Sequence, residues 1–134
     1  MALQYALPSH GASSEYQCSG VPYVITLTVA NTTAQEVSFP FVTRHFTVIH
    51  ATTGGSSVRV GFTNNGVDGA EDENYFLLEK GSSSPRLEIK CQKLWVRNES
   101  GTTSNKVSIV AGLTNVTQDR FFAVTGSNGV AGVG

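Results

Sequence analysis

The feature that most constrains the fold is an alternation of apolar and polar side chains with a period of two residues. Residues 23–29 read YVITLTV, and the apolar side chains at Tyr23, Ile25, Leu27 and Val29 fall on one side. Successive side chains of a β-strand point to opposite faces, so such a run buries one face only. Comparable short runs follow at residues 36–41, 43–51, 57–63, 74–79, 86–98, 107–113 and 121–124. Turn residues separate them about every 8 to 12 positions, and no segment has a helical period, which predicts an all-β sandwich or jelly roll of eight or nine short strands.

Three places in this series carry more specific signals. Residues 52–55, TTGG, have the composition of a tight turn, so we expect the runs at 43–51 and 57–63 to pair as a hairpin. Pro40 interrupts the run at 36–41. Near Gln92 the alternation changes phase, which indicates a β-bulge or two abutting strands. The side chains expected to face inward from the predicted hairpin are Phe46, Val48, His50, Val58, Val60 and Phe62.

Length and composition predict a single domain with an arm at each end. The chain has 134 residues with 40% hydrophobic content, enough for one core. Residues 1–20 are polar and irregular, and residues 126–134 are rich in glycine. We therefore expect flexible N- and C-terminal arms around a β-domain at residues 21–125, either disordered or ordered by a neighbouring subunit.

Charge and hydropathy argue against several classes of partner. Only 14% of the residues are charged, the net charge is −1, and the basic residues are scattered, so we expect no direct contact with nucleic acid. The N-terminus lacks the basic region of a signal peptide. No apolar run approaches the roughly 20 residues of a transmembrane segment. We expect a soluble protein that is not secreted through a signal peptide.

Cysteines and sequons give weak signals. Cys18 and Cys91 could form a long-range disulfide, but two thiols, with Cys91 facing the core, are the commoner arrangement. The sequons at Asn31, Asn98 and Asn115 arise easily in a chain rich in Ser and Thr, and we interpret them as loop residues.

No constellation of residues typical of an enzyme is present. The chain has three histidines, His10, His45 and His50, and none belongs to a catalytic or zinc-binding motif. His45 and His50 lie five residues apart on one expected strand, so they point to opposite faces and cannot share a metal. We expect no catalytic residues and no cofactor.

An acidic group between two expected strands is a weak candidate for a metal site. Asp68, Glu71, Asp72 and Glu73 offer oxygen ligands of the kind that Ca²⁺ prefers. Their spacing does not match a known calcium loop, and neighbouring side chains point in different directions. A solvated turn-rich loop is the favoured interpretation, with Asn65-Gly66 as its turn dipeptide.

Aromatic residues raise the possibility of a carbohydrate site. Tyr75, Phe76 and Trp95 could form a platform on which sugar rings stack. A lone Trp in an all-β protein more often lies in the core or a subunit contact. The sugar-binding module therefore stands as an alternative interpretation.

The order of several short segments resembles a family of viral structural proteins. FPFVTRHFTV, RVGFTNNGV, NYFLLEKG, LEIKCQKLWVRN and VSIVAGLT follow one another between residues 39 and 114, over half of the chain. This order is similar to that of single-jelly-roll capsid proteins of large icosahedral double-stranded DNA viruses, particularly the penton type at five-fold vertices. The acidic stretch at residues 68–73 departs from this likeness by lengthening one turn.

The resemblance implies an all-β fold, a single jelly roll that is an eight-stranded antiparallel β-sandwich. It implies a homo-pentamer that contacts the major and minor capsid proteins, and a location in the virion after assembly inside the host cell. No catalytic residue, cofactor or metal comes with it, and it assigns no interface residue. A shell-decorating module is the alternative within the same fold.

Overall fold

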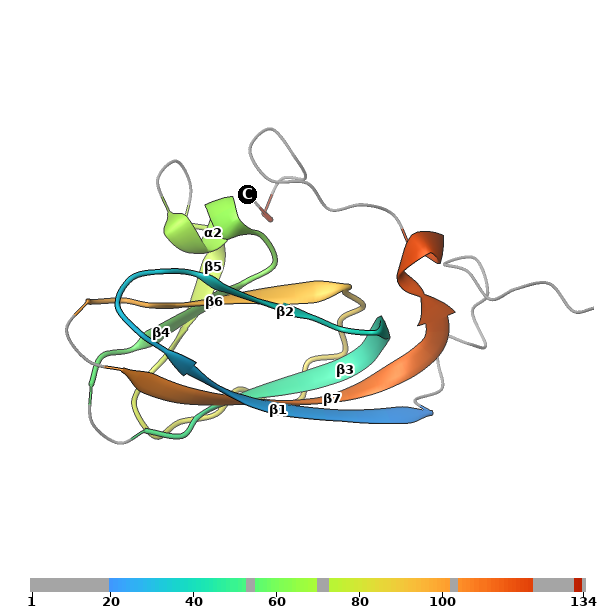
Figure 1. Ribbon diagram of the computed structural model, residues 1–134, viewed down its shortest axis with the longest axis horizontal. Helices are drawn as coiled ribbons and strands as arrows, with labels where there is room; N and C mark the ends of the chain where they lie inside the picture. The colour runs from blue at the N-terminus through green and yellow to red at the C-terminus, as the bar shows by residue number, and fades with distance from the viewer. Residues whose placement is uncertain (1–19, 53–54, 70–72, 102–103, 122–131, 134) are drawn as a thin grey trace, which may run out of the picture.

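The computed structural model describes residues 20–52, 55–69, 73–101, 104–121 and 132–133, which form a sandwich of two antiparallel β-sheets (Figure 1). Strands β1, β7 and β3 form sheet A, in that order, and strands β2, β6, β4 and β5 form sheet B. The elements are β1 (Val21–Val29), β2 (Gln35–Ser38), β3 (Phe41–His50), β4 (Val58–Gly61), α2 (Asn64–Asp68), β5 (Tyr75–Leu78), β6 (Lys93–Asn98), β7 (Asn105–Thr117) and a 3-10 helix (Gln118–Arg120). The all-β prediction is confirmed.

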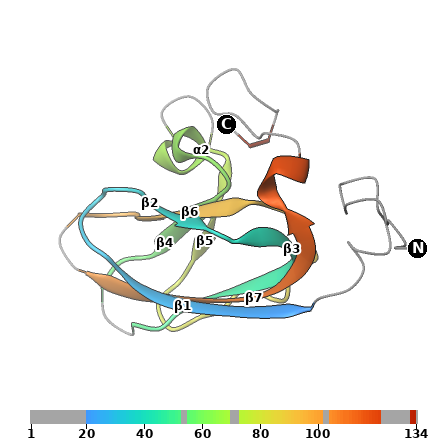
Figure 2. The ribbon, with the colours of Figure 1, turned by 45° about the vertical axis from the view of Figure 1, so that its right-hand side comes forward.

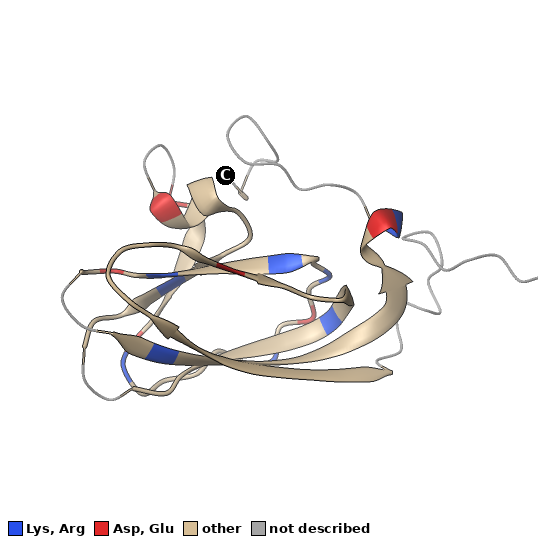
Figure 3. Cartoon of the chain, viewed as in Figure 1, with Lys and Arg blue, Asp and Glu red and all other residues tan. Residues whose placement is uncertain are grey.

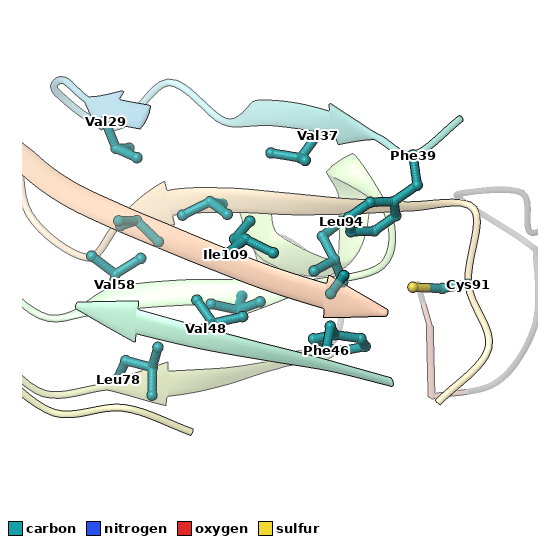
Figure 4. Close-up of a cluster of buried hydrophobic side chains, with 14 of the residues drawn as sticks. Val29, Val37, Phe39, Phe46, Val48, Val58, Leu78, Cys91, Leu94 and Ile109 are labelled. Atoms are coloured by element: carbon teal, nitrogen blue, oxygen red, sulfur yellow. The ribbon is translucent and has the colours of Figure 1, made fainter. Parts of the chain in front are cut away.

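The alternation predicted along the chain sets which side chains enter the core. In β1 the side chains of the predicted inner face are buried or half-buried, and those between them are exposed. Phe46, Val48 and His50 of β3 are all at most 1% exposed. The core fills the space between the sheets (Figure 4). Its buried members are Val29, Val37, Phe39, Phe46, Val48, Val58, Val60, Leu78, Cys91, Leu94, Val96, Val107, Ile109, Ala111 and Leu113.

The hairpin predicted between residues 43–51 and 57–63 is wrong. Strand β3 pairs with β7 in sheet A, with Val48 opposite Ile109, whereas β4 pairs with β5 and β6 in sheet B. The connection after His50 therefore crosses from one sheet to the other. Two strands that face each other across a core need the same inward apolar alternation as two strands of one sheet. The pattern could not distinguish these two arrangements.

The phase change near Gln92 separates a segment that lies along β3 from strand β6 of sheet B. Residues 82–91 run along β3, and the backbones of Phe46 and Leu87 donate to each other at 3.0 and 2.8 Å. The amide of Thr43 donates to the carbonyl of Cys91 at 3.1 Å, close to the end of this segment. Strand β6 then begins at Lys93 in sheet B. Of the predicted bulge or two abutting strands, only β6 is a strand, because residues 82–91 form just the isolated bridges at Ser83 and Leu87. The chain leaves β3 for sheet B at this point, which explains the change of phase.

Helix α2 differs from the prediction, which makes Asn65-Gly66 the turn dipeptide of a loop. Thr63 precedes the helix in an extended conformation and its hydroxyl accepts from the amide of Gly66 at 2.9 Å, a typical N-cap. Gly69 ends the helix in the left-handed conformation with φ of 70°. Helix α2 lies against sheet B at β4 and β6 (Figure 2). A single helical turn is too short to show a helical period, so only its caps could have revealed it.

The ends of the domain differ in part from expectation. Strand β7 extends from Asn105 to Thr117, beyond the predicted run at residues 107–113. Of the strand predicted at residues 121–124, only Phe121 lies within the described part, where it follows the 3-10 helix and packs on Val42 and Val116. The predicted arms lie outside the described residues, apart from Gly20 and residues 132–133.

Candidate functional site

Within the described part of the chain, a group of linked charged side chains lies on the outer face of sheet B, beside helix α2. Arg59 of β4 forms a two-point ion pair with the carboxylate of Glu99. Its Nη1 atom donates to the carbonyl oxygens of Val67 and Asp68 at 3.1 and 2.9 Å. The guanidinium also lies 4.4 Å from the ring centre of Tyr75. One arginine therefore connects β4, β5, the end of β6 and the last turn of α2.

A second arginine completes this cluster from the neighbouring strand. Nη1 of Arg97 on β6 donates to the carbonyl of Asp68 at 2.9 Å and lies 3.3 Å from its carboxylate. Both guanidinium groups thus meet the carbonyl end of α2, where the helix dipole favours positive charge. The hydrogen bond from Arg59 lowers the pKa of Glu99 and raises that of Arg59. The cluster clamps α2 onto sheet B, and its charges are already matched.

The predicted metal ligands do not converge. Asp68 lies at the end of α2 and pairs with Arg97, and Glu73 is exposed before β5. Glu71 and Asp72 lie outside the described residues. Within the described ranges, no group of three or more His, Cys, Asp or Glu side chains is arranged to hold a metal ion.

The three aromatics of the predicted sugar platform are divided between the two faces of sheet B. Phe76 packs against the core. Tyr75 and Trp95 lie on either side of Gly61, which pairs with both. Val67 of α2 occupies the space above Gly61, because a Cβ atom there would lie 2.8 Å from a Val67 methyl carbon. Helix α2 thus sits between the two rings, and they form no continuous stacking surface.

The remaining polar candidates fall in separate places. His50 is buried at 1% exposure at the end of β3, and His45 is half-buried, while His10 lies outside the described residues. Asn31 occupies a turn with φ of 56°. The prediction that all three sequons lie in loops is wrong for the other two, since Asn98 ends β6 and Asn115 lies within β7.

Asn98 belongs to a sequon, but its side chain makes structural hydrogen bonds inside the domain. Its side chain is fully buried, and its Nδ2 atom donates to the carbonyl of Val29 at 2.8 Å. Its Oδ1 atom accepts from Nδ2 of Asn105, also at 2.8 Å. The amide thereby joins the ends of β1, β6 and β7 and is inaccessible in the folded protein. The sequence signal for this burial was the alternation along β6, in which Asn98 stands at an inward-facing position.

Cys91 faces the core as predicted, and we expect its thiol to be unreactive. The side chain is buried, and burial raises its pKa to about 12, against a smaller opposing effect of the hydrogen bond with Thr43. Because the thiolate is the reactive species, the folded C18S variant should react with a disulfide reagent at least about 100-fold more slowly than the same variant in urea. Equal rates in the folded and unfolded states would contradict this burial.

An exposed apolar patch on the outer face of sheet A is the candidate interaction surface. Val24 of β1 and Val110 of β7 are cross-strand neighbours and are 68% and 41% exposed. Beside them Thr26 and Ser108 share a hydrogen bond of 2.8 Å, and Thr47 of β3 lies opposite Val110. We call these five residues the β1 face. Strand β1 has no charged side chain, and the β1 face has none either (Figure 3).

The β1 face was not predicted, although the sequence held a signal for it. Val24 and Val110 both stand at the outward phase of their strands, where a polar side chain is usual. Each is unremarkable alone, because single exposed apolar residues are common. Only the register of β1 on β7 places them side by side.

Comparisons with protein-family models, with curated proteins and with solved structures found no match to this chain. Among the residues that the structure describes, no helix has the length and apolar content needed to cross a bilayer.

Proposed function

We propose that the protein is a structural subunit of a viral capsid, the penton that assembles as a pentamer at five-fold vertices. In this role it contacts the major and minor capsid proteins, and it resides in the virion after assembly inside the host cell. Its fold is a single jelly roll of eight strands. The observation that carries the proposal is the strand order, taken together with the ordered segments between residues 39 and 114 that resemble this family.

Support for the jelly roll comes from the segment at residues 82–91. Counted as the missing strand, it extends sheet A to four strands in the order β1, β7, β3 and 82–91, opposite the four strands of sheet B. The chain then alternates between the sheets at every step except from β4 to β5. Two interleaved four-stranded sheets of this kind are the arrangement of a jelly roll.

Hydrogen bonds along the whole length of residues 82–91 support its role as a strand. The amide of His50 donates to the carbonyl of Ser82 at 2.9 Å, and the amide of Ser84 donates to that of Val48 at 2.8 Å. At the other end the hydroxyl of Thr43 donates to the carbonyl of Ile89 at 2.8 Å. Ile49 lies opposite Ser83 and Phe46 lies opposite Leu87, so the segment has one residue more than β3 between the two bridges, as in a β-bulge.

The surface properties of the described residues suit a protein that packs against copies of itself. The charge cluster beside α2 is internally matched, and the five residues of the β1 face carry no charge and include two exposed valines. Interfaces between subunits favour apolar, charge-poor centres. We assign the β1 face to the contact between copies of this chain.

The test is the mass of the assembly at high protein concentration. We expect native mass spectrometry to find a pentamer for the unaltered chain, and to find monomers for Val24→Asp, because burying a carboxylate in an apolar contact is costly. Leu77→Asp is the matched control: Leu77 is 48% exposed on β5 of the other sheet, and this variant should still form the pentamer. Monomers of the unaltered chain, also in the presence of its shell partners, would refute the pentamer.

A second experiment separates the vertex subunit from a shell-decorating module. Particles assembled without the protein should be open or unstable at the vertices if it is the penton. Closed and stable particles would favour the decorating role.

A further inference from the structure

Strand β1 is the outer strand of sheet A beside β7, and it is long and uncharged (Figure 1). Its nine residues keep an unbroken register with β7, from Val21 opposite Leu113 to Val29 opposite Asn105. The edge strands of sheet B, β2 and β5, have only four residues each, and β2 carries Glu36. Proteins commonly protect an edge strand by shortness, charge or a bulge, because an unprotected edge can pair with another strand. Strand β1 lacks all three.

The hydrogen bonds of β7 determine which backbone groups of β1 point out of the sheet. The amide of Ala51 donates to the carbonyl of Lys106 at 2.8 Å, so Lys106 faces the β3 side of β7. The amide and carbonyl of one residue point to the same side of a strand, and successive residues alternate. The odd-numbered residues of β7 from 105 to 113 therefore face β1, where the register pairs them with odd-numbered residues. The even-numbered residues of β1 point their backbone groups away from the sheet. We call these groups the β1 edge, and they belong to Pro22, Val24, Thr26 and Thr28.

Two groups of the β1 edge are unavailable to a further strand. Pro22 has no N–H group to donate. The carbonyl of Thr28 already accepts from Nε2 of Gln35 at 2.9 Å. The groups that remain are the carbonyl of Pro22, the amide and carbonyl of both Val24 and Thr26, and the amide of Thr28. Within the described part of the chain, none of these remaining groups has a hydrogen-bond partner.

The remaining groups are complementary to those of a second copy of the same strand. If two β1 strands run antiparallel about a two-fold axis at Ile25, Val24 lies opposite Thr26 of the second copy, and each donates to the other. The amide of Thr28 then donates to the carbonyl of Pro22 of the second copy. The N–H group that Pro22 lacks would face the carbonyl of Thr28, which already has a donor in its own chain. Every available group thus obtains a partner.

Other antiparallel registers of the two strands leave groups unmatched. A shift of the axis to Val24 places the carbonyl of Thr26 opposite Pro22, which has no N–H group. A shift of the axis to Thr26 places the amide of Val24 opposite the occupied carbonyl of Thr28. The backbone therefore selects the register centred on Ile25.

The side chains suit the same register. On the inner face, Ile25 lies opposite Ile25 of the second copy, and Tyr23 lies opposite Leu27. These three side chains are half-buried at the margin of the core, so pairing would cover apolar surface that the single chain leaves in contact with water. On the outer face, Val24 lies opposite Thr26, and no charge enters the contact on either face.

We propose that the β1 edge is an interface with a second copy of this chain, formed by antiparallel pairing of the two β1 strands about a two-fold axis at Ile25. The pairing joins two three-stranded sheets into one continuous sheet. A two-fold contact closes with two copies, whereas a five-fold ring needs a head-to-tail contact. The interface therefore links a protomer to a copy outside any ring of five, and it does not depend on the proposed function.

Disulfide trapping tests the register in the full chain with Cys18→Ser as background. Directly opposite side chains of an antiparallel pair have Cβ atoms about 4.5–5.5 Å apart, which oxidised glutathione can bridge for two cysteines after a small adjustment. We expect Ile25→Cys to form a covalent dimer. Tyr23→Cys alone and Leu27→Cys alone should not, because identical positions are then about 13 Å apart along the strands, but an equal mixture of the two should. No dimer from Ile25→Cys, or an equal yield from Tyr23→Cys alone, would overturn the proposal.

A proline at the β1 edge tests the role of the backbone. Thr26→Pro removes an outward amide that β7 does not use, a change that an edge strand tolerates. We expect sedimentation equilibrium to show a dimer dissociation constant at least about tenfold higher, because each copy loses a donor to the other. Thr26→Val keeps the amide and the branched shape, so it is the matched control and should keep the dimer. Equal constants for the two variants would contradict the pairing.

Amide exchange of the unaltered protein needs no variant. We expect the amides of Val24 and Thr26 to exchange at least about tenfold more slowly at high than at low protein concentration, while those of Ile25 and Leu27, which bond to β7, stay protected at both. Exchange of Val24 and Thr26 that is independent of concentration would refute the edge contact. A pentamer with such exchange would support the ring alone, whereas dimers without pentamers would support the edge contact and refute the ring.

Discussion

Replacing Leu94 with alanine is expected to lower the free energy of unfolding by about 3 to 5 kcal/mol. Leu94 is fully buried on β6, and its neighbours in the core come from both sheets. The substitution removes the transfer free energy of the lost carbons and leaves a cavity that close packing on both sides keeps open. Urea unfolding followed by tryptophan fluorescence would measure the loss.

Leu77→Ala is the matched control for this prediction. Leu77 is also a leucine on a strand of sheet B, but it stands at the outward phase of β5 and is 48% exposed. We expect this variant to lose less than about 1 kcal/mol, because much of the side chain already contacts water. Equal losses for the two leucines would mean that the assigned inward and outward faces of sheet B are wrong.

Replacing Thr43 with valine is expected to cost about 2 to 3 kcal/mol, although the two side chains have nearly the same shape. Thr43 is fully buried, and its hydroxyl donates to the carbonyl of Ile89 at 2.8 Å and accepts from the amide of Cys91 at 3.0 Å. In the valine variant, the carbonyl of Ile89 and the amide of Cys91 lose the hydroxyl as a hydrogen-bond partner. The loss should appear in the urea unfolding midpoint with little change in its slope.

Thr47→Val gives the control on the same strand. Thr47 is half-buried at the outward phase of β3, and we expect its replacement to change stability by less than about 0.5 kcal/mol. Amide exchange would locate the effect: Thr43→Val should raise exchange at Leu87, whose amide donates to Phe46 at 2.8 Å. Unchanged protection there would argue against residues 82–91 acting as the eighth strand.

Burial was more predictable than pairing in this protein. The inward phase of β1, β3 and β4 followed from alternation, because the pleat fixes the direction of each side chain. The strand that pairs with β3 could not be predicted in this way. A neighbouring strand of the same sheet and a strand facing β3 across the core have the same alternation. The wrong hairpin at residues 52–55 comes from this limit.

Contacts between polar side chains, like the pairing of strands, could not be predicted from the sequence. No spacing in the sequence connects Arg59 with Glu99, or His50 with Ser56, yet each pair is in contact. The composition of the acidic stretch suggested metal ligands. In the structure the carbonyl of Asp68 accepts hydrogen bonds from Arg59 and Arg97, and its carboxylate pairs with Arg97. Val24 and Val110 became a surface only through their register.

The sequence by itself determined the all-β class, the positions of most strands and the side chains that enter the core, because these depend on local backbone geometry and on the removal of apolar surface from water. The tertiary structure decided which strands share a sheet, where α2 packs, and which polar groups meet at His50 and Arg59. These depend on contacts between residues far apart in the chain, whose register is set by the packing of the whole sandwich.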